Sequence, residues 1–269
     1  MIVPLWLASI GWLVAHDVWP GWAASDAPTL RVTDWLKQAG KRAQFTIHNS
    51  MGPVGTVWTD YFLDEESIQR EDTILISDSG LRSLFPLRMI ISSVYTADGT
   101  LDEFTVRMDN YHGSVRLHGE RFPSDFSFTL ETPTVFRAFK IPLTDGRIIS
   151  GGFNPFAQIA DVHVGQRWRM QMFNPVAALT GLGSRFIPMV VAVTAKETIA
   201  PHGSPIECFI VEAADAKAWV DLNGAVQEQV VTLPVLGTMR IVREQGYDEE
   251  ACRAVRRGHF PTAARGRHP

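Results

Sequence analysis

The sequence predicts a mostly β protein: a curved antiparallel sheet or half-barrel, with one N-terminal transmembrane helix. Three observations lead to this prediction. Apolar residues recur at every second position in segment after segment, turn-forming residues separate those segments, and a long apolar run begins the chain. Alternation with a period of two is typical of strands that bury one side and expose the other, and short turns between such strands are typical of a meander.

The N-terminal residues 1–24 are predicted to anchor the protein in a membrane. The run from Ile2 to Ala24 is long enough, at ~1.5 Å per residue, to cross a hydrocarbon layer of ~30 Å. Trp22 stands where a cleavable signal peptide needs a small residue, which favours an uncleaved anchor. Asp17 is costly inside a span, so we expect it near the interface or beside a buried partner. The domain that follows is then expected in the periplasm or otherwise outside the cytoplasm.

Residues 25–42 are predicted as a linker with a short helix at Asp34–Ala39, and residues 43–246 as the antiparallel β domain. Strands are expected from residue 43 to 47 and at 54–63, 68–76, 135–141, 166–173, 189–199, 206–213, 216–222, 226–233 and 238–243, with a meander across 87–130. The Asn223-Gly224 pair between two alternating runs predicts a tight hairpin. Residues 142–165 lack alternation and are predicted as a long loop that could act as a lid. Residues 247–269 are predicted as a short helix and a basic tail.

Composition and motifs argue against several classes of protein. The net charge of -4 and a pI near 6.1 do not favour a nucleic-acid partner, which needs clustered Lys and Arg. The 8 histidines lack metal-ligand spacing, and no phosphate-loop, zinc-protease or hydrolase motif occurs. Cys208 and Cys252 are better explained as unpaired thiols than as a disulfide, and Cys208 lies in a run typical of a buried strand rather than of a nucleophile. We therefore expect no enzyme, metal or cofactor.

The apolar face of the sheet is the remaining candidate site. Methionine adapts to apolar partners of varied shape, and several methionines occupy apolar strand positions together with aromatic residues. The predicted ligand-binding residues are Met89, Met108, Phe128, Trp168, Met170 and Met172. The alternative, that these side chains only pack against each other or against a covering helix, stays open at this point.

Four segments carry a resemblance to a known family. Gly165-Gln166-Arg167-Trp168, Phe173-Asn174-Pro175, Ala218 to Val226 and Gly237 to Glu244 resemble an extracytoplasmic bacterial domain that often precedes transglutaminase-like domains in membrane-anchored proteins. Its sheet is similar to the lipoprotein-carrier fold of periplasmic lipid chaperones. The resemblance covers roughly residues 44–244. The chain ends soon after, so no transglutaminase-like catalytic residue is carried over, and the resemblance implies a non-enzymatic envelope domain.

Two hypotheses for function follow. In the first, the membrane-anchored domain holds a lipid or a hydrophobic segment of a partner on the apolar face of its curved sheet. In the second, it is a non-catalytic accessory or structural subunit whose anchor and strand edges dock to a membrane protein, as a polar residue such as Asp17 within a span would favour.

Overall fold

The computed structural model describes residues 41–64, 67–77, 86–96, 100–110, 113–142, 147–149, 162–173, 186–213, 216–233 and 237–258. The predicted anchor at 1–24, the predicted helix at Asp34–Ala39 and the tail from residue 259 lie outside these ranges. Within the described ranges, no helix has the length and apolar character needed to span a membrane.

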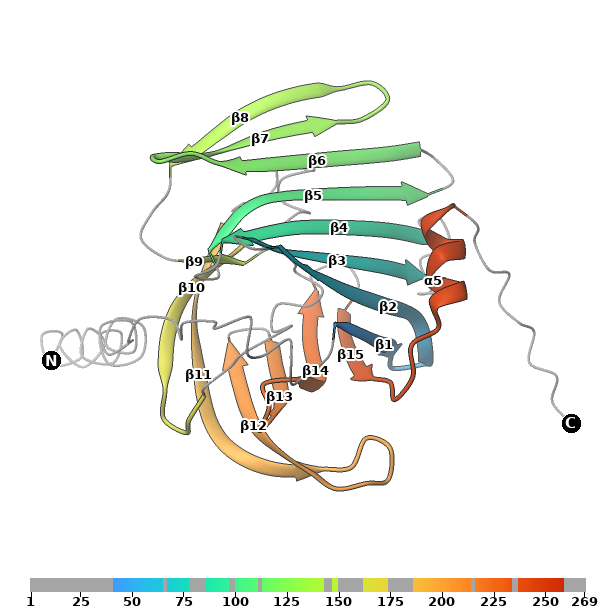
Figure 1. Cartoon of the computed structure of the whole chain (residues 1–269), viewed down its shortest axis with the longest axis vertical. Helices are drawn as coiled ribbons and strands as arrows, with labels where there is room; N and C mark the ends of the chain where they lie inside the picture. Colours follow the sequence, from blue (N-terminus) through green and yellow to red (C-terminus); the bar gives the residue numbers. More distant parts are fainter. Residues whose placement is uncertain are drawn as a thin grey trace, which may run out of the picture.

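Within the described ranges, fifteen strands form one sheet, and one helix packs on it (Figure 1). The strands are β1 (Arg42–Asn49), β2 (Gly52–Leu63), β3 (Ser67–Ile76), β4 (Leu87–Thr96), β5 (Leu101–Asn110), β6 (Gly113–Arg121), β7 (Asp125–Glu131), β8 (Phe136–Pro142), β9 (Arg147–Ile149), β10 (Arg167–Phe173), β11 (Phe186–Ile199), β12 (Ile206–Ala213), β13 (Ala216–Asp221), β14 (Val226–Leu233) and β15 (Gly237–Arg243). The helix is α5 (Glu249–Arg256).

The sheet is built almost wholly from strands that are neighbours in the sequence. From β8 to β1 and from β15 to β10, each strand pairs antiparallel with the next, and the β1–β15 pair joins the two runs, with Ile47 opposite Ile241. Among the strands that the structure describes, only β9 and β10 pair in parallel. The sheet bends so strongly that its edge strand β9 contacts β5, while β6, β7 and β8 continue beyond this point (Figure 1). The predicted curved antiparallel sheet is therefore confirmed.

The observed strands match the predicted ones closely, with two differences. Strand β9 lies inside the segment 142–165, which was predicted without strands; that prediction is wrong for Arg147–Ile149. Three residues are too few for alternation to reveal. Strand β11 begins at Phe186 and pairs Pro188 with Gln171, so it starts earlier than the predicted 189. The predicted Asn223-Gly224 hairpin is present, with Gly224 at φ +82° and the Asp221 carboxylate accepting from the backbone N–H of Asn223.

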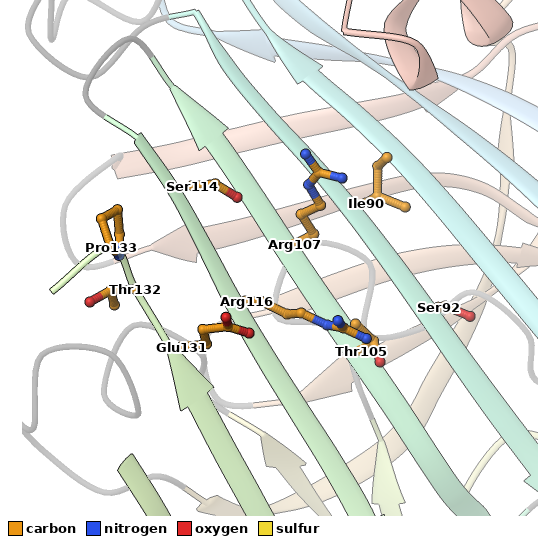
Figure 2. A pocket seen from close by; sticks show the side chains of 9 residues that line it. All are labelled: Ile90, Ser92, Thr105, Arg107, Ser114, Arg116, Glu131, Thr132 and Pro133. Carbon is orange, nitrogen blue, oxygen red and sulfur yellow. The ribbon is translucent and has the colours of Figure 1, made fainter. Parts of the chain in front are cut away.

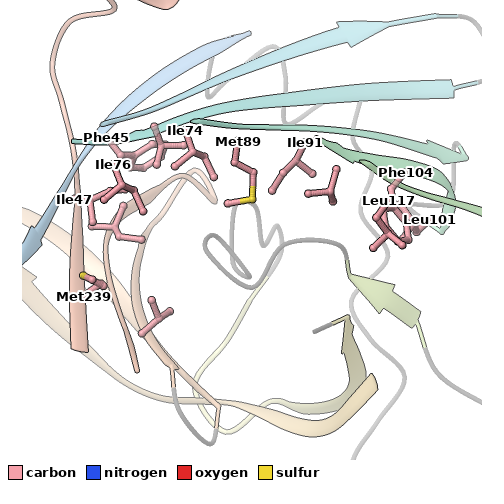
Figure 3. Packing of buried hydrophobic residues seen from close by; sticks show 14 of the residues in the cluster. Phe45, Ile47, Ile74, Ile76, Met89, Ile91, Leu101, Phe104, Leu117 and Met239 are labelled. Atoms are coloured by element: carbon pink, nitrogen blue, oxygen red, sulfur yellow. The ribbon is translucent and has the colours of Figure 1, made fainter. Parts of the chain in front are cut away.

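Alternation places the main core on one face of the sheet, called the inner face here. Phe45, Val57, Ile74 and Met89 lie at successive paired positions from β1 to β4, and all are buried; the half-buried Met108 of β5 stands opposite Met89. Figure 3 shows Phe45, Ile74 and Met89 projecting toward the opposite wall of the bent sheet, where Met239 lies on β15. This core holds the first eight strands against β14 and β15.

The opposite, outer face carries α5. Trp58 and Leu75 point away from the inner face and pack with Cys252 and Val255 of the helix. A second apolar cluster, around Trp168, Val191, Val211 and Val220, fills the inner face of β10 to β14.

Candidate functional site

The four predicted ligand-binding residues whose side chains the structure describes fall into two groups on the inner face. Met89, Met108 and Phe128 belong to the main core, where Met89 and Met108 stand directly opposite each other on β4 and β5. Trp168 belongs instead to the second cluster, opposite Val191. Met89, Phe128 and Trp168 are buried and Met108 is half-buried.

Met170 and Met172 follow Trp168 at intervals of two along β10. Their backbones pair with Met189 and Ile187 of β11. Their side chains lie outside the described part of the structure. The binding role predicted for both residues stays a prediction.

Phe128 is the centre of an aromatic group at the β5–β8 end of the inner face. Its ring centroid lies 5.2 Å from that of Phe126, 5.8 Å from that of Phe104 and 5.0 Å from that of Phe139. Gly119 leaves room for the rings, because a Cβ there would lie 2.6 Å from Cε1 of Phe104 and 2.8 Å from Cε1 of Phe126. Aromatic pairs at such distances add to the stability gained from burial.

The inner face becomes polar toward the β2–β3 turn. Arg70 and Asp72 occupy the same side of β3 as Ile74, and both are buried. Arg70 Nη2 lies 2.7 Å from Asp72 Oδ2, and Thr59 Oγ1 donates to Asp72 Oδ1 at 2.6 Å. Burial alone would lower the pKa of Arg70, but the adjacent Asp72 and Tyr61 raise it, so the guanidinium stays charged.

A second arginine reaches the same region from the other run of strands. Arg243 of β15 stands opposite Phe45 of β1, with its guanidinium carbon 5.9 Å from the Phe45 ring centroid. Burial lowers the pKa of Arg243, while Asp221 and Tyr61 partly offset this effect. Tyr61 therefore lies within electrostatic reach of both arginines.

A pocket of about 650 Å³ lies on the outer face of β4 to β7 (Figure 2). Ile90, Arg107, Arg116 and Glu131 form one row across these four strands. The other lining residues are Ser92, Thr105, Ser114, Thr132 and Pro133. Its arginines and hydroxyl groups suit a polar ligand, and the pocket contains none of the six predicted binding residues.

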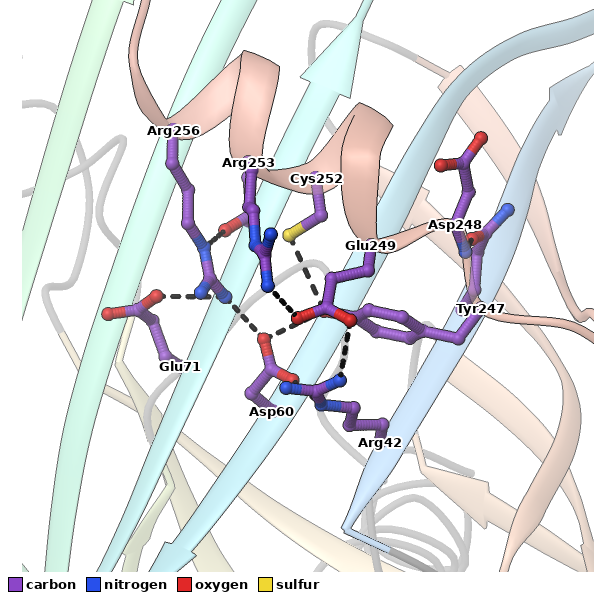
Figure 4. A network of polar contacts seen from close by, with 11 residues as sticks. Arg42, Asp60, Glu71, Tyr247, Asp248, Glu249, Cys252, Arg253 and Arg256 are labelled. Carbon is purple, nitrogen blue, oxygen red and sulfur yellow. Dashed lines mark hydrogen bonds and ion pairs between the residues drawn. The ribbon is translucent and has the colours of Figure 1, made fainter.

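The C-terminal helix is fixed to the outer face by a network of charges (Figure 4). Arg256 Nη2 lies 2.5 Å from Asp60 Oδ2 and 2.8 Å from Glu71 Oε1, and Tyr247 donates its hydroxyl hydrogen bond to Asp60 at 2.8 Å. Asp248 caps the helix by accepting from the N–H of Ala251 at 2.9 Å. The segment after residue 246 was predicted as a short helix and basic tail; its helix is confirmed, and Arg256 is paired with acids on the sheet.

Arg88 joins the helix to the sheet from the other end. Its Nη1 donates to the carbonyl oxygens of Val255 and Arg256 at 2.9 and 3.2 Å, where a helix leaves carbonyls without partners. Its Nε and Nη2 donate to Asp109 Oδ2 at 3.0 and 2.6 Å. Burial would raise the pKa of Asp109, but hydrogen bonds from Ser114 and Arg88 outweigh it and lower the pKa.

The cysteines are both free and buried, as the sequence predicts for unpaired thiols. Burial raises the pKa of Cys208 to about 12 and also raises that of Cys252, so neither has the low pKa of a reactive thiolate. Among the residues that the structure describes, no group of three or more His, Cys, Asp or Glu is arranged to hold a metal ion.

Sequence reasoning missed the Arg70–Asp72 pair, the Arg88–Asp109 pair and the docking of α5. A signal for the covered outer face exists in the consecutive apolar residues Ile74, Leu75 and Ile76, because a strand with one wet face alternates. The Arg70–Asp72 pair also leaves a trace, since the two residues interrupt the apolar side of β3.

Comparisons with known proteins give no family. No protein-family model matches the chain, and no curated protein matches it. Among solved structures, it is similar to a β-barrel-like protein of a domain of unknown function, DUF1849, from Brucella abortus, with 11% identity, a TM-score of 0.44 and coverage of 77% of this chain and 97% of that one. It is also similar to a DUF1089 family protein from Pseudomonas aeruginosa, with 16% identity, a TM-score of 0.37 and coverage of 67% and 90%.

Proposed function

We propose that this protein is a non-catalytic, membrane-anchored binding domain, facing away from the cytoplasm, that holds a lipid or a hydrophobic segment on the inner face of its bent sheet. The observation that carries the proposal is the inner face itself. Met89, Met108 and Met239 lie on it from three strands of the two facing walls, among aromatic and branched side chains. Unbranched, polarizable methionine side chains can repack around apolar groups of different shape.

The anchor and the compartment rest on the sequence alone. Residues 1–24 supply the apolar run and the interfacial tryptophans Trp19 and Trp22. A domain held close to a bilayer can exchange hydrophobic ligands with it over a short distance, which suits a lipid-holding sheet.

The direct test is native mass spectrometry of the full chain, released from non-ionic detergent, before and after organic extraction. A shortened chain ending near residue 246 is unsuitable, because it would expose Trp58 and Leu75 under α5. We expect a discrete adduct of lipid mass that extraction removes. A chain that shows only its own mass before extraction would contradict the proposal.

Two methionine variants locate the ligand. Met108→Gln places an amide on the half-buried inner position, whereas Met51→Gln changes a methionine that is 76% exposed in the β1–β2 turn. Losing about half of a methionine's apolar contact weakens binding about fivefold. We expect this loss for Met108→Gln and none for Met51→Gln; equal effects would place the ligand elsewhere.

A second candidate function, an accessory subunit of a membrane complex, is favoured by the edge strand β8. This strand ends the order of the described strands, so only one of its sides is paired within that part of the chain, and Phe136, its first residue, is 73% exposed. An open edge of this kind can add a partner's strand. Phe136→Asp should abolish capture of a membrane partner by the full chain, and Leu222→Asp, at an exposed residue far along the sequence, should not. Equal capture by both variants would rule out docking at β8.

A further inference from the structure

The inner face has an apolar part and a charged end within the same strands. Along β3, inner positions run from Ile76 and Ile74 to Asp72 and Arg70, and the last one before the turn is the buried Ile68. The positions of β4 that pair with Ile74, Asp72 and Arg70 are Met89, Ile91 and Ser93, in that order. Between Ile74 and Arg70, the inner face of β3 therefore changes from apolar to charged. This distribution matches a molecule with an apolar chain and a polar head.

Arg70 is the group in this end whose hydrogen bonding is incomplete. Its side chain is 6% exposed, and Nη2 makes an ion pair with Asp72 at 2.7 Å. Within the described residues, however, neither Nε nor Nη2 has a partner with hydrogen-bond geometry. Buried donors nearly always have partners, and leaving one unsatisfied is costly. Asp72 also accepts a hydrogen bond from the hydroxyl of Thr59, so the donors without a partner in this pair belong to Arg70.

Two arginines lie on the inner face near this end. Arg70 of β3 stands opposite Tyr61 of β2, and Arg243 lies on β15, opposite Phe45 of β1. Among the described residues, Asp72 is the only acidic side chain at the inner positions of β2, β3, β4 and β15. Burial lowers the pKa of Arg243, and Asp221, at the end of β13, partly offsets this effect. The planar fork of an arginine matches the paired oxygens of a carboxylate or phosphate.

We propose that the inner face binds an amphiphile with a negatively charged oxyanion head group, which accepts hydrogen bonds from Arg70 while its chain lies along Ile91, Ile74 and Met89. This inference rests on the proposed function, since it names the class of lipid that the same face holds. The head group is a carboxylate, as in a fatty acid, or a phosphate, as in an anionic phospholipid.

The test compares lipids that differ only in head-group charge. Native mass spectrometry of the delipidated full chain in non-ionic detergent gives apparent dissociation constants for oleic acid against oleyl alcohol and for dioleoyl phosphatidic acid against dioleoylglycerol. A hydrogen bond to a charged group is worth about tenfold or more in affinity. We expect at least one acid to bind about tenfold more tightly than its neutral partner, and the pair that shows the difference identifies the source of the head group.

Arg70→Met alone would leave Asp72 buried without its cation and could prevent folding. The double variant Arg70→Met/Asp72→Leu removes both charges and fills similar volume, which is often tolerated. We expect it to bind the neutral lipids as wild type does and to lose the preference for the acid, to within about threefold. Arg253→Gln, which removes an exposed arginine on the outer surface of α5, should keep the full preference.

The outcomes separate the two proposals. If neutral and acidic lipids bind equally to the wild-type chain, or if the double variant keeps the preference, the head-group role of Arg70 is wrong and the lipid-holding function stands. If none of the four lipids binds, both proposals fail.

Discussion

The two faces of strands β2 to β5 are held to the rest of the protein by different interactions. On the inner face, Val57, Ile74, Met89 and Met108 stand side by side and pack with the facing wall of the same sheet. On the outer face, α5 is held by arginines that pair with acids on the strands. The difference teaches that apolar packing, which is not directional, holds the two walls of the inner face together, while directional ion pairs fix one helix in one place.

The largest expected loss of stability comes from the inner face. Phe128→Ala removes a buried ring that contacts three other aromatic rings, and large-to-small changes of this kind cost about 3–5 kcal/mol. We expect the upper part of that range in the free energy of unfolding, measured by urea titration of the full chain followed by circular dichroism. A loss below about 1 kcal/mol would mean that this end of the inner face is loosely packed.

The next effect lies on the outer face. Arg88→Leu leaves the buried carboxylate of Asp109 and the carbonyls of Val255 and Arg256 without their shared donor, and breaking a buried pair costs about 3–5 kcal/mol. We expect the lower end, because Arg107 still donates to Asp109.

The double variant Arg88→Leu/Asp109→Leu is the control for Arg88→Leu, and it should recover part of the lost stability. Urea titration of both variants measures the free energy of unfolding and shows whether the double variant recovers part of it. An equal loss in the single and double variants would contradict a specific role for the pair.

Acid should weaken the outer face selectively. The pKa of Asp109 is lowered in the folded protein, so its contribution to stability is complete above the unfolded pKa of about 3.9 and is lost as the pH falls through the folded value. Urea midpoints measured between pH 7 and pH 3 should fall more for wild type than for Asp109→Asn below about pH 4. Parallel curves would show that Asp109 does not carry this dependence.

The smallest effect is expected at the exposed surface of α5. Arg253 pairs with Glu249 one turn away, and both side chains are exposed. Exposed pairs of this spacing contribute about 0.3–0.5 kcal/mol. Arg253→Gln should therefore shift the urea midpoint only slightly, and a shift comparable to that of Arg88→Leu would overturn the distinction between buried and exposed pairs.

Much of this fold could be predicted from local sequence, because the sheet is almost entirely a meander. Alternation in β4 to β7 and the Asn223-Gly224 turn lie within short windows, and each strand pairs with its sequence neighbour. The apolar inner residues Met89, Met108, Phe128 and Trp168 were found in the same way.

The contacts that fix α5 on the outer face could not be predicted from local sequence. Arg88 donates to Val255, 167 residues away, and Arg256 pairs with Asp60, 196 residues away. No local pattern relates such positions. Arg70 and Asp72 were missed for another reason: alternation along β3 places both on the side of Ile74, but it does not show that they are buried and pair with each other.

Methyl NMR of the full chain with ¹³C-labelled methionine, titrated with oleic acid, tests the central claim most directly. Met89 and Met108 report on the inner face, and the exposed Met51 reports on bulk contact with lipid or detergent. Met-to-Leu variants at these three positions assign the signals. The account predicts saturable shifts at Met89 and Met108 and none at Met51. Saturable binding that leaves both inner methionines unchanged would contradict it.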